Sequence, residues 1–242
     1  MTEIWGHRGA PAYAPENTLP SFELALEHGV DGVEFDVQRS TDGVLVVVHD
    51  ESISRTSNGV GRVPDLTYEE LRRCDFSNGF VGFRNTRIPT LRETLELLGS
   101  AGVRINIELK NGVQPYPGME LEVLELVQEM ELLDRVVISS FNHVSLAALR
   151  GVVPPENLGL LYTAQVFDPW RYAQYFGAGA IHPYHRVLDQ PDFMWLCHEA
   201  GIRVHTWTAD EDKDVEHLTR IGVDAIITNL PDRARRVSRR TR

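Results

Sequence analysis

The feature that most constrains this fold is a regular alternation of short apolar runs with amphipathic stretches along the chain. Buried parallel strands read as near-continuous apolar runs, and stretches with a period of 3.6 residues read as helices that cover them. The predicted strands are residues 4–7, 32–37, 104–109, 136–140, 158–162, 179–182, 203–207 and 224–228. The predicted helices are residues 19–28, 91–100, 119–132, 144–150, 169–176, 191–200 and 212–220. Eight strands with seven intervening helices favour an α/β fold, a (β/α)8 TIM barrel, over a doubly wound sheet.

A ninth apolar run, residues 41–48, has no place in an eight-stranded barrel. It begins with the turn signal Thr41-Asp42-Gly43, so we expect the second strand to continue past the barrel rim and fold back as a hairpin. Counting outward from this turn places residue 48 opposite residue 36 and residue 49 opposite residue 35. The hairpin would therefore return His49 to the level of Asp36.

The chain is predicted to form one barrel domain over residues 1–242, with two additions. Residues 51–89 exceed a normal loop, contain a capping box at Thr67 and Glu70, and are expected to form a small inserted excursion after the hairpin. The terminal residues 233–242, RARRVSRRTR, contain six arginines and are expected to be a frayed basic tail.

The balance of charges excludes some classes of partner. A net charge of -11 argues against a general nucleic-acid binder, because phosphate backbones demand a basic surface. Cys74 and Cys197 stand far apart without a zinc or disulfide pattern. The chain has no apolar run of about 18 residues and no signal-peptide pattern at its N-terminus, so we expect a cytoplasmic protein without stable membrane insertion, a monomer or a homodimer.

The carboxyl ends of the predicted strands carry the candidate chemistry, since active sites of such barrels lie at that face. Glu34 and Asp36 alternate with apolar residues, so both side chains face the same way, and Glu108 ends the third predicted strand. Three clustered carboxylates would repel each other without a cation, and their hard oxygens suit Ca²⁺ or Mg²⁺. The sequence therefore predicts one divalent cation; an exposed pair of acids bonded to arginines is the alternative for Glu34 and Asp36.

Basic residues and histidines are expected on the same rim. Arg8 follows the first strand, and Lys110, one of only two lysines, follows the third, so both could neutralise a phosphate. His7 and His49 could serve as general acid and general base, although either alone is more often structural. This set fits the cleavage of a phosphodiester.

Two further candidate residues, Asn17 and Trp207, each have two possible roles. Asn17 is interpreted first as a helix N-cap, with a ligand contact as the alternative. Trp207, like Phe141 and Tyr162, stands at a late strand end and either packs at the barrel top or lines a substrate groove.

The motifs HRG, PENT, EFD, HD and ELK, with IPTLRETLELL, VHTWT and GVDAIITNLPD, resemble the glycerophosphodiester phosphodiesterase family over nearly the whole chain. The resemblance implies a TIM barrel that hydrolyses small-molecule glycerophosphodiesters to sn-glycerol 3-phosphate and an alcohol. By motif position it implies His7 and His49 as catalytic residues, Glu34, Asp36 and Glu108 as metal ligands, and Arg8 and Lys110 as phosphate contacts. The sequence IHPYH departs from the family, so His182 and His185 either alter the alcohol pocket or pack.

Two competing functions remain open at this point. A phospholipase D-like activity on lysophospholipids would use the same residues and an apolar rim, for which Phe80, Phe83 and Trp207 are candidates. A barrel that binds a phosphodiester without cleaving it is the non-catalytic alternative.

Overall fold

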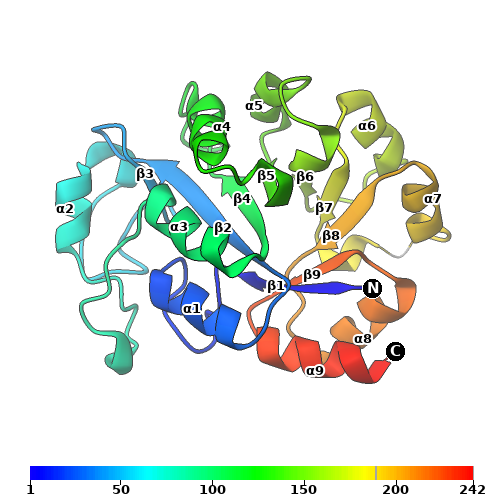
Figure 1. The fold of residues 1–242 in the computed structure, drawn as a ribbon, viewed down its shortest axis with the longest axis horizontal. Helices are drawn as coiled ribbons and strands as arrows, with labels where there is room; N and C mark the ends of the chain where they lie inside the picture. The colour runs from blue at the N-terminus through cyan, green and yellow to red at the C-terminus, as the bar shows by residue number, and fades with distance from the viewer. Residues whose placement is uncertain (189, 242) are drawn as a thin grey trace.

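The predicted (β/α)8 barrel is confirmed in a computed structural model that describes residues 1–188 and 190–241. Eight parallel strands close into a ring because β1 pairs with both β9 and β2, and helices surround this ring (Figure 1). The strands are β1 (Glu3–His7), β2 (Gly32–Arg39), β3 (Leu45–Val47), β4 (Arg104–Leu109), β5 (Val136–Ser140), β6 (Leu158–Tyr162), β7 (Ala180–Pro183), β8 (Arg203–Thr206) and β9 (Ala225–Thr228).

Apart from α2, the α-helices each bury an apolar face in the core around the strands. They are α1 (Leu19–Glu27), α2 (Tyr68–Arg73), α3 (Leu91–Ala101), α4 (Met119–Glu129), α5 (His143–Leu146), α6 (Pro169–Phe176), α7 (Phe193–Glu199), α8 (Asp212–Ile221) and α9 (Pro231–Thr241). Short 3-10 helices span Val63–Asp65, Val81–Phe83, Leu133–Arg135, Ala147–Leu149, Pro155–Asn157 and His185–Val187. In α3, Thr90 and Glu93 form the predicted capping box.

The predicted hairpin is also confirmed, with the predicted register. Strand β3 runs antiparallel to β2, and Val47 pairs with Val37, which places residue 48 opposite residue 36. The Val48 N–H donates to the Asp36 carbonyl at 3.0 Å. Gly43 turns the chain with a φ of 87°, a conformation that glycine adopts without strain. The hairpin therefore delivers His49 to the carboxyl end of β2.

The segment after the hairpin packs with the returning strand of the hairpin around a second, small apolar cluster. Its buried members are Val46, Val48, Ile53, Val63, Leu71, Phe76 and Ile88. The capping box of Thr67 and Glu70 begins α2, and Figure 1 shows α2 beside β3, on the far side of β3 from the ring. This segment thus lies next to the strand end that carries His49.

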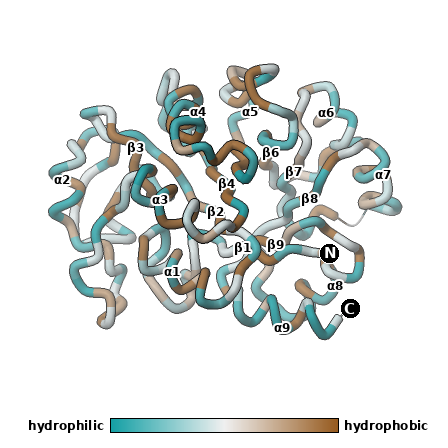
Figure 2. Tube along the Cα trace, viewed as in Figure 1, coloured by the Kyte–Doolittle hydropathy of each residue, from teal (hydrophilic) through white to brown (hydrophobic). Residues whose placement is uncertain are grey.

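The expectation of a frayed C-terminal tail is wrong for the residues that the structure describes, and Arg242 lies outside them. Residues Pro231–Thr241 form α9, which contacts α8 and β1. Ala234 and Val237 are buried at i, i+3 spacing, while the arginines make the helix largely hydrophilic in Figure 2. Ion pairs of Arg233 with Asp212 and of Arg235 with Asp31 hold its polar side. The prediction missed this helix because the many arginines suggested an unstructured tail, although two apolar residues lie on one helical face.

Among the described residues, the helices are all too short or too polar to cross a lipid bilayer.

Candidate active site

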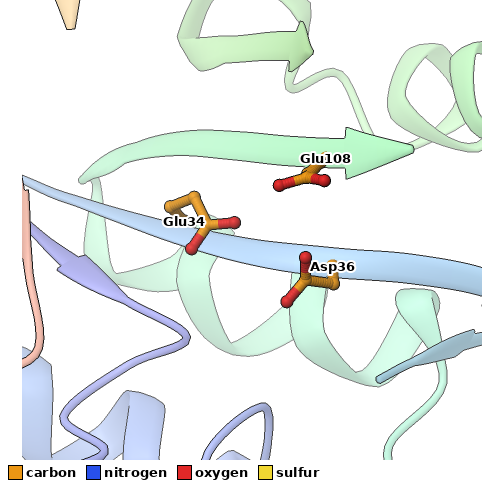
Figure 3. Close-up of side chains that lie close together, drawn as sticks. All are labelled: Glu34, Asp36 and Glu108. Atoms are coloured by element: carbon orange, nitrogen blue, oxygen red, sulfur yellow. The ribbon is translucent and has the colours of Figure 1, made fainter. Parts of the chain in front are cut away.

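The three acids predicted as metal ligands meet at the carboxyl end of the barrel. Glu34 and Asp36 point from β2, and Glu108 of β4 is paired in register with Asp36 (Figure 3). One oxygen atom of each carboxylate lies within 4.8 Å of the others, and all three side chains are buried. The alternative of an exposed acidic pair is therefore excluded.

Crowding and burial disturb the protonation of this triad. Burial first, and then the charges of Asp36 and Glu108, raise the pKa of Glu34 well above its usual range. Burial and Asp36 likewise raise the pKa of Glu108. For Asp36, burial acts upward but Arg8, His49 and Lys110 hold the pKa below its usual range. The raised pKa values of Glu34 and Glu108 show that the three carboxylates repel one another, and a bound dication would offset this repulsion.

The donor set fits a hard divalent cation. All three ligand groups are carboxylates, which suit Ca²⁺ or Mg²⁺ better than zinc or copper. The Oδ1 atom of Asp36 is buried and has no hydrogen-bond donor, although Lys110 Nζ lies 3.8 Å away. A buried anionic oxygen without a donor is costly unless a cation reaches it.

Two basic side chains flank the triad, as predicted. Arg8 Nε lies 3.2 Å from Asp36 Oδ2, and the Arg8 backbone N–H donates to Glu34 Oε2 at 3.1 Å. Lys110 Nζ donates to Glu108 Oε1 at 2.7 Å. Burial lowers the pKa of Lys110, but Glu108 and Asp36 outweigh it and raise that pKa above its usual value. Both groups are therefore cationic at neutral pH.

His7 is held by a chain of hydrogen bonds that begins at Asn229, directly after β9. Its Nδ1 lies 2.7 Å from Asn229 Oδ1, and Asn229 Nδ2 donates to Asp210 Oδ2 at 2.7 Å. Because a carboxylate can only accept, the amide nitrogen of Asn229 must face Asp210 and its oxygen must face His7. His7 therefore carries its proton on Nδ1 and leaves Nε2 as an acceptor. Burial, and then the charge of Arg8, lower the pKa of His7 to about 4.

His49 has a different kind of partner. Its Nδ1 lies 2.6 Å from Asp50 Oδ1, and Arg55 Nε donates to the other oxygen of Asp50 at 2.6 Å. The Arg55 hydrogen bond and His49 lower the pKa of Asp50 to about 2. Lys110 Nζ lies 3.2 Å from His49 Nε2. His7 is thus hydrogen-bonded to a neutral amide, and His49 to a carboxylate.

Glu16 connects Arg8, which flanks the triad, to Arg55, which supports Asp50 beside His49. It accepts hydrogen bonds from Arg8 at 2.8 Å and from both terminal nitrogens of Arg55. Arg55 belongs to the segment after the hairpin, so Glu16 ties that segment to the loop after β1. Sequence reasoning missed Glu16, although PENT contained it.

The N-cap interpretation of Asn17 is wrong. Thr18 occupies the N-cap position of α1, and Asn17 has a φ of 56°. Asn17 is buried; its Nδ2 donates to Asp36 Oδ2 at 2.8 Å, and its Oδ1 accepts from the Asp36 N–H at 3.3 Å. Its side chain therefore orients a triad acid.

A cavity of about 50 Å³ lies over the triad, lined by both histidines, Arg8, Lys110, Trp207 and Phe141 among others. Trp207 Nε1 donates to the His182 carbonyl at 2.8 Å, which fixes the indole ring at the rim. Tyr162 is not among the residues that line this cavity, and Phe80 and Phe83 pack against each other instead.

The two histidines of IHPYH pack away from this cavity. His182 lies inside the barrel, where its Nε2 is 2.9 Å from Nδ1 of His205. His185 Nε2 lies 3.4 Å from Asp214 Oδ2. Neither histidine lines the cavity over the triad, so the structure favours the interpretation that they pack.

Comparison with known proteins gives one consistent result. The glycerophosphoryl diester phosphodiesterase family profile matches residues 7–233. A glycerophosphodiester phosphodiesterase from Caldanaerobacter subterraneus subsp. tengcongensis is 40% identical over 232 residues, covering 96% of this chain and 95% of the relative. One from Bacillus altitudinis is 39% identical, covering 97% of each.

Solved structures agree. A phosphodiesterase from Oleispira antarctica, in complex with the product sn-glycerol-3-phosphate, superposes with a TM-score of 0.87 at 28% identity, covering 98% of this chain and 96% of the other. A glycerophosphodiester phosphodiesterase from Agrobacterium tumefaciens has a TM-score of 0.84 at 28% identity, covering 97% and 99%.

Proposed function

Because this chain belongs to the glycerophosphoryl diester phosphodiesterase family and is a phosphoric diester hydrolase, we propose that it cleaves glycerophosphodiesters to sn-glycerol 3-phosphate and an alcohol. The observation that carries this proposal is one cavity lined by two acids of the triad, Arg8, Lys110 and both histidines, with the third acid, Asp36, clustered with the other two. The product bound in the Oleispira antarctica protein supports the assignment of a glycerol phosphate.

Glu34, Asp36 and Glu108 would hold one Ca²⁺ or Mg²⁺ ion. When bound, the ion supplies a Lewis acid that polarises a phosphoryl oxygen. The three carboxylates fit this role because they are hard ligands, buried and close enough to share one ion. Asn17 keeps Asp36 in position through its two hydrogen bonds.

Arg8 and Lys110 would bind the remaining phosphate oxygens. Both line the cavity, and both contact triad carboxylates. A bound phosphodiester gives them new anionic partners, and Lys110 can then leave Nε2 of His49 free.

The partners of the two histidines support different roles for them. His7 is neutral at physiological pH and presents an unprotonated Nε2, so it accepts the proton of the attacking oxygen, whether that oxygen belongs to water or to the glycerol 2-hydroxyl. His49 Nδ1 is hydrogen-bonded to the carboxylate of Asp50, so Nε2 is the atom that would serve the leaving group. Once Lys110 withdraws, Nε2 would take up a proton from solvent and give it to the leaving alcohol. One P–O bond forms on the side of His7 while the other breaks beside His49.

The test measures release of sn-glycerol 3-phosphate from a panel of glycerophosphodiesters and release of choline from lysophosphatidylcholine, each with Ca²⁺, with Mg²⁺ and with a chelator. We expect metal-dependent release from the glycerophosphodiesters. Turnover only of the lysophospholipid would replace the proposal with the phospholipase D-like activity. Binding without turnover would replace it with the non-catalytic barrel.

A further inference from the structure

A second cavity adjoins the catalytic one on the side of His49. It has a volume of about 330 Å³ and shares His49, Glu108, Lys110 and Phe141 with the smaller cavity. Since His49 protonates the leaving oxygen in the proposed mechanism, the alcohol part of the substrate must lie on this side. This step rests on the proposed function.

The charges in the walls of the larger cavity do not balance. It is lined by three acids, Asp50, Glu51 and Glu108, against Lys110 as the single lysine or arginine. Asp50 is neutralised by Arg55 at 2.6 Å, and Glu108 by Lys110 at 2.7 Å. Among residues 1–188 and 190–241, no Lys, Arg or His nitrogen forms an ion pair with Glu51. Glu51 therefore leaves a negative charge at this wall.

The rest of the wall suits a weakly hydrated group. Phe141 is 43% exposed, and Val113 is 80% exposed, so both present apolar surface to whatever enters. Trp207 meets the Phe141 ring edge-on at 5.5 Å between centroids, which fixes the orientation of that ring. Lys110 Nζ already lies 6.0 Å from the ring centroid, so the ring is within reach of a cation at this place.

We propose that this cavity selects substrates whose leaving alcohol carries a quaternary ammonium group, with Glu51 and Phe141 as the specificity-determining residues. A methylated ammonium places apolar methyl groups against Phe141 and Val113 and its charge near Glu51. A neutral alcohol gains nothing from Glu51, and an anionic one is repelled by it.

Glu51 is placed for this role by the backbone rather than by its own side chain. The Glu51 carbonyl accepts a hydrogen bond from the Val63 N–H at 2.8 Å, which fixes the backbone at the position from which the Glu51 side chain extends. The segment that delivers His49 thus also supplies the selective charge, two residues later in the chain.

The test compares two substrates of equal shape and different charge: glycerophosphocholine and its carbon isostere, the 3,3-dimethylbutyl diester of glycerol phosphate. Both release sn-glycerol 3-phosphate, so one assay reads both. We expect kcat/KM for the choline ester to exceed that for the isostere by about tenfold. Glu51→Gln and Phe141→Leu should each remove most of this ratio, and Glu125→Gln, at an exposed site on α4, should keep it.

Each outcome separates this inference from the proposed function. Equal kcat/KM for the two esters, or a ratio that survives both variants, would overturn the inference and leave the phosphodiesterase intact. Release from neither ester, with any metal, would overturn the proposed function and the inference with it.

Discussion

Nε2 of His49 lies 3.2 Å from Nζ of Lys110, although the two residues are 61 positions apart in the chain. The β2–β3 hairpin carries His49 back to the end of β2, and the parallel pairing of β2 with β4 places Lys110 beside it. Because an ammonium group can only donate, Nε2 accepts here, and Nδ1 donates to Asp50. A bound phosphate would compete for Lys110, and Nε2 would then be free to take up the proton that it gives to the leaving alcohol.

Replacing either catalytic histidine should reduce turnover without unfolding the barrel. We expect His7→Ala and His49→Ala each to lower kcat for a glycerophosphodiester by about 10² to 10⁴, the usual contribution of a general acid or base. Thermal unfolding should change little, since both side chains border a cavity. His217→Ala, an exposed histidine on α8, is the matched control. Full turnover in both variants would remove the histidines from the mechanism.

Asn229→Asp should move the acid limb of the pH profile. A carboxylate in place of the amide would stabilise the imidazolium of His7 and raise its pKa from about 4, so the base would lose its unprotonated form at higher pH. The acid limb of a plot of log(kcat/KM) against pH should move to higher pH by about one pH unit or more. Asn58→Asp, in the exposed segment after the hairpin, should leave it in place. An unshifted limb would show that His7 is not the base.

Glu34→Gln should stabilise the metal-free protein while abolishing activity. The neutral amide relieves the repulsion within the triad and can still accept from the Arg8 N–H, so we expect about 1–3 kcal/mol more stability at pH 8 in chelator. This gain should shrink as pH falls through the raised pKa of Glu34, because the wild-type carboxylate then also becomes neutral. Denaturant unfolding at pH 8 and pH 5 measures it.

Calcium supplies the complementary readout for the same variant. Added Ca²⁺ should stabilise the wild-type protein and should stabilise Glu34→Gln much less, since one ligand has lost its charge. Glu125→Gln should respond like wild type. Equal stabilisation of all three proteins would place the ion elsewhere.

Much of the fold and the triad could be predicted because local patterns determine them. Alternation within β2 fixed the shared face of Glu34 and Asp36, and the Thr41–Gly43 turn fixed the register that returns His49. The support of His7 could not be predicted, because Asn229 lies 222 residues away and only ring closure brings β9 beside β1.

Two local expectations failed for physical reasons. Asn17 looked like an N-cap, but the next residue, Thr18, takes that position and Asn17 turns inward to Asp36. The arginine-rich end looked unstructured, but Ala234 and Val237 give it an apolar stripe that packs as α9. In both cases a tertiary contact decided between two locally acceptable conformations.

The central claim is that one dication held by Glu34, Asp36 and Glu108 positions a glycerophosphodiester between His7 and His49. A crystal structure with Ca²⁺ and sn-glycerol 3-phosphate tests it most directly. The account predicts one ion at about 2.3–2.6 Å from an oxygen of each acid, a phosphate oxygen on the same ion, and the two imidazoles on opposite sides of the phosphorus. An ion bound elsewhere, or a phosphate out of reach of either histidine, would contradict it.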